Sequence, residues 1–461
     1  MSILKISEGA DPNYLATVVR LPEIKPHPGA DRLSTVEIFG NIIIIAKDMY
    51  TEGEKVVYFP VESAINKEFL SWANLLDKPE LNADEKTKGF FESKGRVRAI
   101  ALRGMPSQGF LYKVSKLAQF YEIKEDSFDI GDTFDTVGDH ILVTKYIKGD
   151  SKKSGEPNVK KSRVPRWIDK TIGIFPKPMR RMAYICVNAW FNTEQDRIAS
   201  QIVTGQFKFH YKTEHLGKNL FLLDPMDEIT VSSKIHGTSA IFSNLLCKKK
   251  FSLYRVIANK FGRNISETEY RFLHASRSII KNKTKDGYGD DVWGVWAEKL
   301  DGGIPEGYSV YGEIAGYTPN GKMIQKNYDY GAFLRDSELY VYRITYTNKD
   351  GEVLDLEWDE IRRFCNTHDL KTVPVYYHGE AQKMFDIPTE EGWHEKFLEK
   401  LREMYLDKPC EFCTTGVIRE GVVLKNNSRG ARPVFKFKSP LFVIGESSAR
   451  DKGEEDIEEL N

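Results

Sequence analysis

The chain has 461 residues, which is long enough for two or three domains that each bury a core. Its 67 basic and 67 acidic residues cancel, so the global charge indicates no class of partner. Five cysteines are too few, and odd in number, for a disulfide scaffold. No apolar run approaches the length of a membrane span and residues 1–12 lack the order of a signal peptide, so we expect a soluble, cytoplasmic protein.

Short apolar runs rich in β-branched residues fill the N-terminal third. Gly, Pro and Asp turns separate these runs. This pattern predicts a small closed β-barrel. The runs lie at residues 15–21, 32–39, 41–46, 55–61 and 96–102. The segment from His27 to Leu33, followed by Val36-Glu37-Ile38, resembles the opening of tRNA-binding OB modules. We therefore expect an OB-fold domain over residues 1–145.

Arginines mark the end of this predicted barrel. Arg96 and Arg98 alternate along the last expected strand, and Arg103 follows it. Side chains two residues apart share one face of a strand, so a face lined by arginines is suited to a phosphate backbone. We predict that these arginines bind nucleic acid. An exposed basic strand without a ligand is the alternative.

Residues 146–204 form a second region with the composition of a basic linker. The stretch 145–181 contains twelve Lys or Arg and three acidic residues. Such a stretch could follow a phosphate backbone. Its Gly, Ser and Pro content is equally typical of a solvated linker.

A lysine at the end of a strand opens the third region, residues 205–445. The run 228–231 is β-branched and predicts a strand that leads to Lys234, which His236 and Gly237 follow in the sequence KIHGTS. A lysine can act as a covalent nucleophile once burial or nearby cations favour loss of its proton. Gly237 lets the backbone approach a nucleotide closely. Lys234 is therefore a candidate nucleotidyl-lysine, against the alternative of a solvated lysine in a turn.

Two further strands supply polar side chains to this region. The run YSVYGEIAG, residues 308–316, places Glu313 where it could accept hydrogen bonds from a ribose. In LYVYRI, residues 339–344, Tyr340 and Tyr342 are expected on one face, where one could stack on a purine. Packing against other side chains explains these tyrosines equally well.

Two C-terminal strands carry charged side chains. Glu420 and Lys425 lie at opposite ends of the apolar run EGVVLK. In FKFKS, Lys436 and Lys438 are expected on one face and the phenylalanines on the other. A pair of lysines beside a nucleotide is suited to hold its α-phosphate.

The same region contains a candidate zinc motif. Cys365 and His368 form a Cys-x-x-His pair, and Cys410 and Cys413 form a Cys-x-x-Cys pair. Both pairs have zinc-ligand spacing and would make a tetrahedral site if the fold brought them together. Chance occurrence of each pair is the alternative.

The chain ends in an acid-rich segment, residues 446–461. Seven acidic residues accompany only Arg450 and Lys452 there. We expect a frayed, solvating tail without a site.

Together these motifs resemble the covalent nucleotidyltransferase superfamily of ligases and mRNA capping enzymes. Arg277, in the sequence ASRS, fits the arginine that usually follows the nucleophile strands. The resemblance covers residues 234–439, with the motifs KIHGTS, YGEIAG, LYVYRI, EGVVLK and FKFKS in this order. It implies an α+β fold, in which an N-terminal OB-fold β-barrel precedes an adenylyltransferase (ATP-grasp-like ligase) domain of antiparallel sheets with flanking helices.

Departures from the superfamily pattern favour RNA ligases. His236 and Ser239 stand where DNA ligases and capping enzymes have Asp and Arg, and they look like nick-sealing RNA ligases. Only 23 residues follow Lys438, too few for a C-terminal OB domain. An N-terminal OB domain is similar instead to the Deinococcus-type RNA ligase and its Naegleria relative. The basic region is longer than that family needs, and the insert at residues 359–408 has no clear counterpart in it.

The resemblance implies ATP-dependent ligation in three steps. Lys234 attacks the α-phosphate of ATP, AMP passes to an RNA 5′-phosphate, and a 3′-hydroxyl then displaces AMP. It implies ATP and Mg²⁺ or Mn²⁺ as cofactors, and RNA or an RNA-containing duplex with 3′-hydroxyl and 5′-phosphate ends as the partner. We expect a monomer.

It also assigns roles around phosphate and metal. Lys436 and Lys438 neutralise phosphate charge, and Lys425 contributes to nucleotide binding. Glu313 holds the ribose or a hydrated metal, and Glu420 supports the metal.

The remaining roles concern the base, the loop and RNA. Tyr342 stacks on adenine, and Arg277 contacts the ribose or the RNA terminus. His236 and Gly237 belong to the nucleotide site, with His236 fixing the nucleophile loop rather than binding metal. Gln108, in a segment that resembles the OB domain of the family, binds RNA with the arginines before it.

Alternatives from other classes remain open at this point. The chain could be a nucleic-acid-binding protein with a vestigial nucleotidyl site, an ATP-dependent DNA ligase or a capping enzyme. The intact lysines and carboxylates of the motifs argue against a vestigial site.

Overall fold

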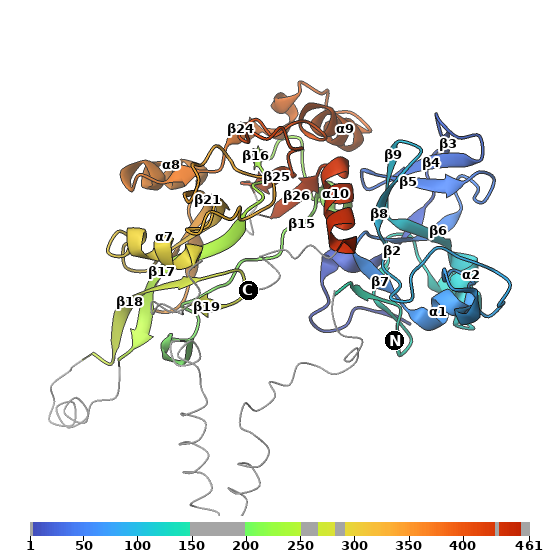
Figure 1. The fold of residues 1–461 in the computed structure, drawn as a ribbon, viewed down its shortest axis with the longest axis horizontal. Coiled ribbons are helices and arrows are strands. Elements are labelled where there is room, and N and C mark those ends of the chain that lie inside the picture. The colour runs from blue at the N-terminus through green and yellow to red at the C-terminus, as the bar shows by residue number, and fades with distance from the viewer. Residues whose placement is uncertain (1–2, 148–198, 250–265, 282–290, 429–432, 453–461) are drawn as a thin grey trace, which may run out of the picture.

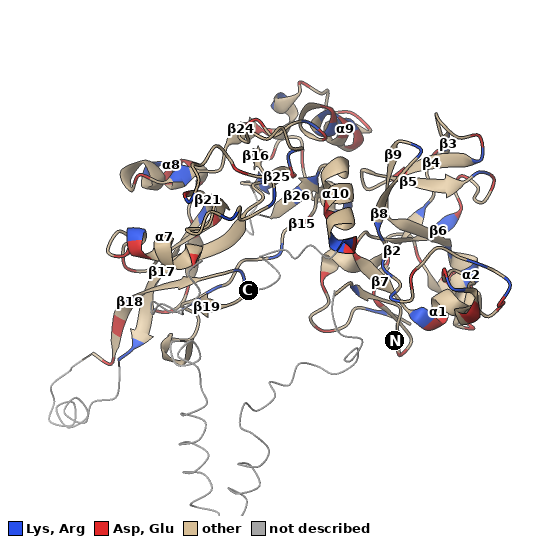
Figure 2. Cartoon of the chain, in the orientation of Figure 1, with Lys and Arg blue, Asp and Glu red and all other residues tan. Residues whose placement is uncertain are grey.

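A computed structural model describes residues 3–147, 199–249, 266–281, 291–428 and 433–452. The chain forms an N-terminal β-rich domain and a larger domain with two sheets (Figure 1). Charges of both signs are scattered over both domains (Figure 2). Within the described residues, no helix is long and apolar enough to cross a membrane.

The N-terminal domain contains all five predicted strands, as an OB fold requires. They are β2 (Ala16–Arg20), β4 (Leu33–Ile38), β5 (Asn41–Ala46), β6 (Lys55–Phe59) and β8 (Ala99–Leu102). The last one starts three residues later than Arg96, so the predicted arginine-lined strand face is not formed.

Shorter strands and two helices complete this domain. They are β1 (Leu4–Lys5), β3 (Lys25–Pro26), β7 (Ser63–Ile65), β9 (Met105–Gln108), β10 (Phe110–Lys113), β11 (Thr133–Phe134), β12 (Thr136–Val137), β13 (His140–Ile141), β14 (Val143–Lys145), α1 (Lys67–Trp72) and α2 (Val114–Phe120). The central sheet has the order β10-β6-β2-β11, and β3-β4-β5 form another. Fully buried aromatic residues, among them Phe59 and Phe69, form the core between the strands and helices.

Two sheets build the larger domain. The first has the order β19-β18-β17-β20-β21-β22, with β23 beside β21, and the second has the order β15-β26-β25-β16-β24. The strands of the first are β17 (Thr238–Lys248), β18 (Thr268–Ala275), β19 (Ile280–Lys281), β20 (Tyr308–Gly316), β21 (Ser337–Thr347), β22 (Val353–Asp355) and β23 (Lys371–Thr372). Those of the second are β15 (Glu214–His215), β16 (Glu228–Ser233), β24 (Val375–Glu380), β25 (Gly421–Asn426) and β26 (Val434–Lys438). Pairing is antiparallel as predicted, except for β15 with β26 and β21 with β23.

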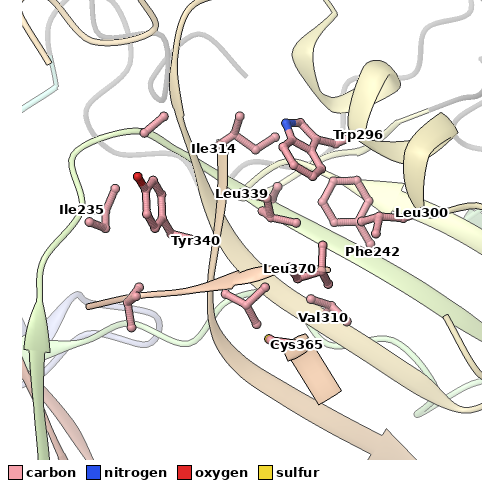
Figure 3. Packing of buried hydrophobic residues seen from close by; sticks show 14 of the residues in the cluster. Ile235, Phe242, Trp296, Leu300, Val310, Ile314, Leu339, Tyr340, Cys365 and Leu370 are labelled. Carbon is pink, nitrogen blue, oxygen red and sulfur yellow. The ribbon is translucent and has the colours of Figure 1, made fainter. Parts of the chain in front are cut away.

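Helices α7 (Val292–Leu300) and α8 (Trp358–Thr367) cover one face of the first sheet. The side chain of Asp291 caps α7 by accepting from Gly294 N. Trp293, Trp296 and Leu300 recur at helical spacing and are buried on the sheet. Figure 3 shows Trp296 and Leu300 beside the strands, and it shows Ile235 of the KIHGTS loop near Tyr340. The core of the sheet therefore also supports this loop.

The predicted insert, residues 359–408, is an integral part of the domain. Its strand β24 pairs with β16, and its helix α9 (Trp393–Tyr405) packs Phe397 and Leu401 on the second sheet. Arg402 of α9 also binds Glu37 of the OB domain through two hydrogen bonds of 2.6 and 3.1 Å. The insert thus connects the two domains.

The acid-rich C-terminal segment is not a frayed tail where the structure describes it. Residues Pro440–Asp451 form helix α10, which begins after Ser439 with a proline in its first turn. The expected boundary at residue 446 therefore falls inside a helix, and Glu446 is an ion-pair partner of Lys438. The composition predicted a solvated segment, because composition alone does not show which acidic residues form ion pairs in the folded chain.

Candidate active site

A cavity of about 220 Å³ lies between the two sheets of the larger domain. Strands β16, β25 and β26 line one side of it, and β17, β20 and β21 line the other. Residues 210–213 and the OB residues Asp11, Asn13, Tyr14 and Lys145 complete the wall. Both domains therefore contribute to the cavity.

Lys234 follows the last residue of β16, as predicted, and lines the cavity. Its backbone N donates to Gly421 O at 3.0 Å, which fixes the start of the loop on β25. Its Nζ lies 2.8 Å from Glu420 Oε1, and 24% of its side chain is exposed. The lysine is thus held at a strand end, ion-paired and accessible.

The loop after Lys234 is tightly packed. A Cβ at Gly237 would lie 2.3 Å from Ile314 O, so only glycine fits. His236 N donates to Tyr330 Oη at 2.6 Å, and the ring contacts Tyr328 and Phe442 edge-on. His236 and Gly237 do not line the cavity, and their contacts with Tyr330 and Ile314 shape the loop.

Glu420 is the central carboxylate of the site, with 3% of its side chain exposed. Oε1 lies 2.8 Å from Lys234 Nζ and 3.0 Å from Lys438 Nζ. Burial raises the pKa of Glu420, but Lys234 and Lys438 outweigh it and hold the pKa well below its usual range. Oε2 is buried and has no hydrogen-bond partner among the described residues, although His236 Nδ1 lies 3.6 Å away.

The paired lysines of β26 lie on one strand face, as the alternation predicted. The phenylalanines that alternate with them, Phe435 and Phe437, are buried on the opposite face. Lys436 lines the cavity, as does Lys425 of β25. Burial, together with Lys438 and Lys234, lowers the pKa of Lys436 to about 7. Lys438 lies instead beside Glu420, so the two lysines have different surroundings.

The first sheet brings Glu313, Arg277 and Tyr342 to the same cavity. Glu313 Oε2 accepts from Ser239 Oγ at 3.2 Å across paired strands. Tyr342 Oη and His210 Nδ1 lie 2.6 Å apart in a hydrogen bond. Of the residues predicted to bind the nucleotide, Arg277, Glu313, Tyr342 and Lys425 line the cavity, whereas Glu420 and the two residues of the loop do not.

The prediction that Tyr340 and Tyr342 share a strand face is wrong. The register of β20 and β21 shifts between Tyr311 and Gly312, so Tyr342 is the extra residue of a bulge. Tyr340 is buried in the core, whereas Tyr342 and the next residue, Arg343, both line the cavity.

The predicted RNA-binding residues of the OB domain are dispersed. Arg96 is 5% exposed and binds Glu62 and Asp451, so burial between the domains removes it from any RNA-binding surface. Gln108 is also buried. Arg98 is partly exposed and pairs with Glu92, while Arg103 is exposed in the turn between β8 and β9.

The candidate zinc site is not formed. Cys365 and Cys410 are buried in the core of the first sheet, and the ring of His368 packs on Phe364. No group of three or more His, Cys, Asp or Glu side chains in the described part of the chain could hold a metal ion. Most of the predicted basic region, residues 148–198, lies outside the described residues.

Sequence reasoning missed several residues around the cavity. Asp11 and Tyr14 come from the N-terminal segment, and His210 precedes the first strand of the larger domain. No local pattern marks them, because the domains approach only in the folded chain. Glu446 could have been found from its spacing to Arg450, which is that of a helical ion pair.

Comparisons with known proteins agree with this geometry. A model of the RNA ligase family matches residues 227–438, and a model of an OB-fold domain matches residues 15–114. The structure of a Naegleria gruberi RNA ligase variant with AMP and manganese is 17% identical and has a TM-score of 0.54, over 93% of this chain and 98% of that chain. The structure of the same ligase with pyrophosphate is 15% identical and has a TM-score of 0.52, over 94% of this chain and 99% of that chain. The chain therefore has the fold of these ligases, and residues 227–438, which contain the cavity-lining strands of both sheets, match the model of the RNA ligase family.

Proposed function

We propose that this chain joins RNA 3′-hydroxyl and 5′-phosphate ends at nicks in duplexes, through lysyl-AMP and RNA-adenylate intermediates. The position of Lys234 carries the proposal, because its amine is ion-paired at the end of a strand and lines a cavity large enough to receive a ligand. Naegleria structures with ATP and manganese, and with AMP and manganese, support ATP and a divalent metal as the cofactors.

Adenylation is a phosphoryl transfer that needs positioning and positive charge. The ammonium of Lys234 first loses a proton; the free Nζ then attacks the α-phosphorus, an N–P bond forms, the bond to the leaving pyrophosphate breaks, and a second proton leaves the nitrogen for solvent or pyrophosphate. Lys425, Lys436 and Arg277 place three cationic side chains on the cavity wall. They would offset the negative charge of the phosphates while the bond is exchanged.

Glu313 and Glu420 would be the protein ligands of a divalent cation. Glu313 lines the cavity, and Glu420 has a buried oxygen without a hydrogen bond in the described structure. Hard cations such as Mg²⁺ and Mn²⁺ prefer such oxygen ligands. When bound, the cation would supply further positive charge to the phosphates of ATP.

Tyr342 and Arg277 complete the proposed nucleotide site. The hydrogen bond with His210 fixes the Tyr342 ring, which would stack on adenine. Arg277 would contact the ribose or the RNA terminus. On the OB domain, Arg98 and Arg103 retain exposed surface and would contact RNA.

A panel of nicked duplexes that differ only in the sugars at the nick tests the substrate. We expect sealing when the 3′-hydroxyl end is a ribonucleotide and the other end carries a 5′-phosphate, with ATP and Mg²⁺ or Mn²⁺. A Lys234→Ala variant serves as the inactive control. Equal sealing of all-DNA nicks would show a DNA ligase instead, and RNA binding without any sealing would show a vestigial site.

A further inference from the structure

Helix α10 lies between the OB domain and the second sheet (Figure 1), and charged residues occur along it (Figure 2). Toward the OB domain, Asp451 Oδ1 accepts from Arg96 at 2.6 Å, and Arg450 donates to Glu62 Oε2 at 3.1 Å. One turn earlier on the helix, Glu446 Oε2 accepts from Lys438 Nζ at 3.3 Å. Glu446 is the residue of this helix that reaches toward the active site.

Lys438 lies between two carboxylates. Its Nζ is 3.0 Å from Glu420 Oε1 and 3.3 Å from Glu446 Oε2, and it also lies 5.1 Å from the centre of the Phe442 ring. Phe442 and Glu446 are four residues apart and therefore share the helix face that covers Lys438. Burial lowers the pKa of Lys438, but Glu446 and Glu420 outweigh it and raise the pKa above its ordinary value.

Lys234 and Lys438 share a single oxygen of Glu420. Two ammonium groups beside one carboxylate oxygen repel each other, so the arrangement needs a second negative charge to hold one of them. Glu446 provides that charge, with its Oε2 3.3 Å from Lys438 Nζ. It does not line the cavity, and its hydrogen bond toward the active site is the one with Lys438.

We propose that Glu446 is a positioning residue for adenylation, which anchors Lys438 and thereby keeps Glu420 in place beside the amine of Lys234. The inference rests on the proposed function, since adenylation of Lys234 is the step that it serves. When a ligand or cation competes for Glu420, Glu446 retains Lys438 within the site.

Glu446 is itself tied to the OB domain. Arg450 Nη2 lies 3.6 Å from Glu446 Oε1, and Arg450 Nη1 lies 3.1 Å from Glu62 Oε2. Glu62 also binds Arg96 at 2.7 Å. A continuous series of ion pairs therefore connects the docked OB domain with the carboxylate that holds Lys234.

Three variants of the full chain test this role: Glu446→Gln, Glu446→Asp and the matched control Glu403→Gln, which removes an exposed carboxylate from the surface of α9. The rate of lysyl-AMP formation is measured at saturating ATP and Mn²⁺, together with the KM for ATP and the thermal midpoint. We expect Glu446→Gln to lower the maximal rate about tenfold while KM changes less than about twofold, because the reacting amine is misplaced and the nucleotide cavity is intact. Glu446→Asp retains the charge and should recover most of the rate, and Glu403→Gln should match the unchanged chain.

Two results would overturn the inference. One is an unchanged adenylation rate in Glu446→Gln. The other is an equal loss of rate in the Gln and Asp variants with equally lowered thermal midpoints, which would assign Glu446 a purely structural role. Failure of the proposed function is distinguishable, because the unchanged chain would then form no lysyl-AMP, and the inference would fall with it.

Discussion

Replacing Glu420 by glutamine removes the central charge of the site and leaves the side-chain volume almost unchanged. The carboxylate is 3% exposed and lies 2.8 Å from Lys234 Nζ and 3.0 Å from Lys438 Nζ. At an effective dielectric constant of about 20, each pair has about 5 to 6 kcal/mol of Coulomb energy, most of which offsets the cost of burying the charges. Removing one partner of a buried pair typically costs about 3 to 5 kcal/mol. Glutamine keeps an acceptor oxygen for one lysine, so we expect the free energy of unfolding to fall by about 3 kcal/mol.

This loss should lower the thermal midpoint of the catalytic domain by about 6 to 12 °C. Calorimetry of Glu420→Gln beside the exposed-site control Glu403→Gln measures it. The variant should also form lysyl-AMP at about one hundredth of the normal rate or less, because the amine loses the carboxylate that positions it. A midpoint within about 2 °C of the unchanged chain, combined with a rate within about twofold, would refute this account of Glu420.

Three further substitutions test other parts of the site. Lys436→Met should slow adenylation yet raise the thermal midpoint at pH 6, where the buried ammonium is charged. Because the pKa of Lys436 is about 7 in the folded chain and higher in the unfolded chain, this gain in stability should be full below pH 7 and shrink as the pH rises above 7. A difference in thermal midpoint that does not depend on pH would contradict this. Gly421→Ala should lower the free energy of unfolding by about 3 kcal/mol or more in chemical denaturation, since the backbone has φ +146° and a Cβ would lie 2.2 Å from Phe437 O. Gly445→Ala, which lies in open space on α10, should instead stabilise the chain. Tyr342→Phe removes the hydrogen bond with His210 and should raise the KM for ATP about fivefold, with an unchanged KM as the contrary result.

Local periodicity predicted the parts of the site that depend on one strand. The alternation in FKFKS correctly placed Lys436 and Lys438 on one face, because the neighbouring phenylalanines need burial. The β-branched run before Lys234 likewise predicted its strand. The same reasoning failed for Tyr340 and Tyr342, since the bulge depends on pairing with β20 and leaves no mark in the local pattern.

Contacts between distant segments were not predictable from the sequence. Arg96 has the pattern of a surface arginine, but α10 covers it, so its partner is Asp451. Glu446 looked like one acid in a solvated tail, although it pairs with a lysine of the site. The four candidate zinc ligands had suitable spacing, but Cys365 and Cys410 are buried in the core of the first sheet and the described residues form no metal cluster. In each case, the sequence pattern allows more than one role for the residue, and only the contacts formed in the folded chain distinguish them.

Mapping of the nucleotidylated residue tests the central claim most directly. The full chain is incubated with α-labelled ATP and Mn²⁺ in the absence of RNA, digested, and analysed by mass spectrometry, with Lys234→Ala as the control. We predict AMP on the peptide that contains Lys234, no label from GTP, and no label in the variant. Labelling of another residue, or no label in the unchanged chain, would contradict the account.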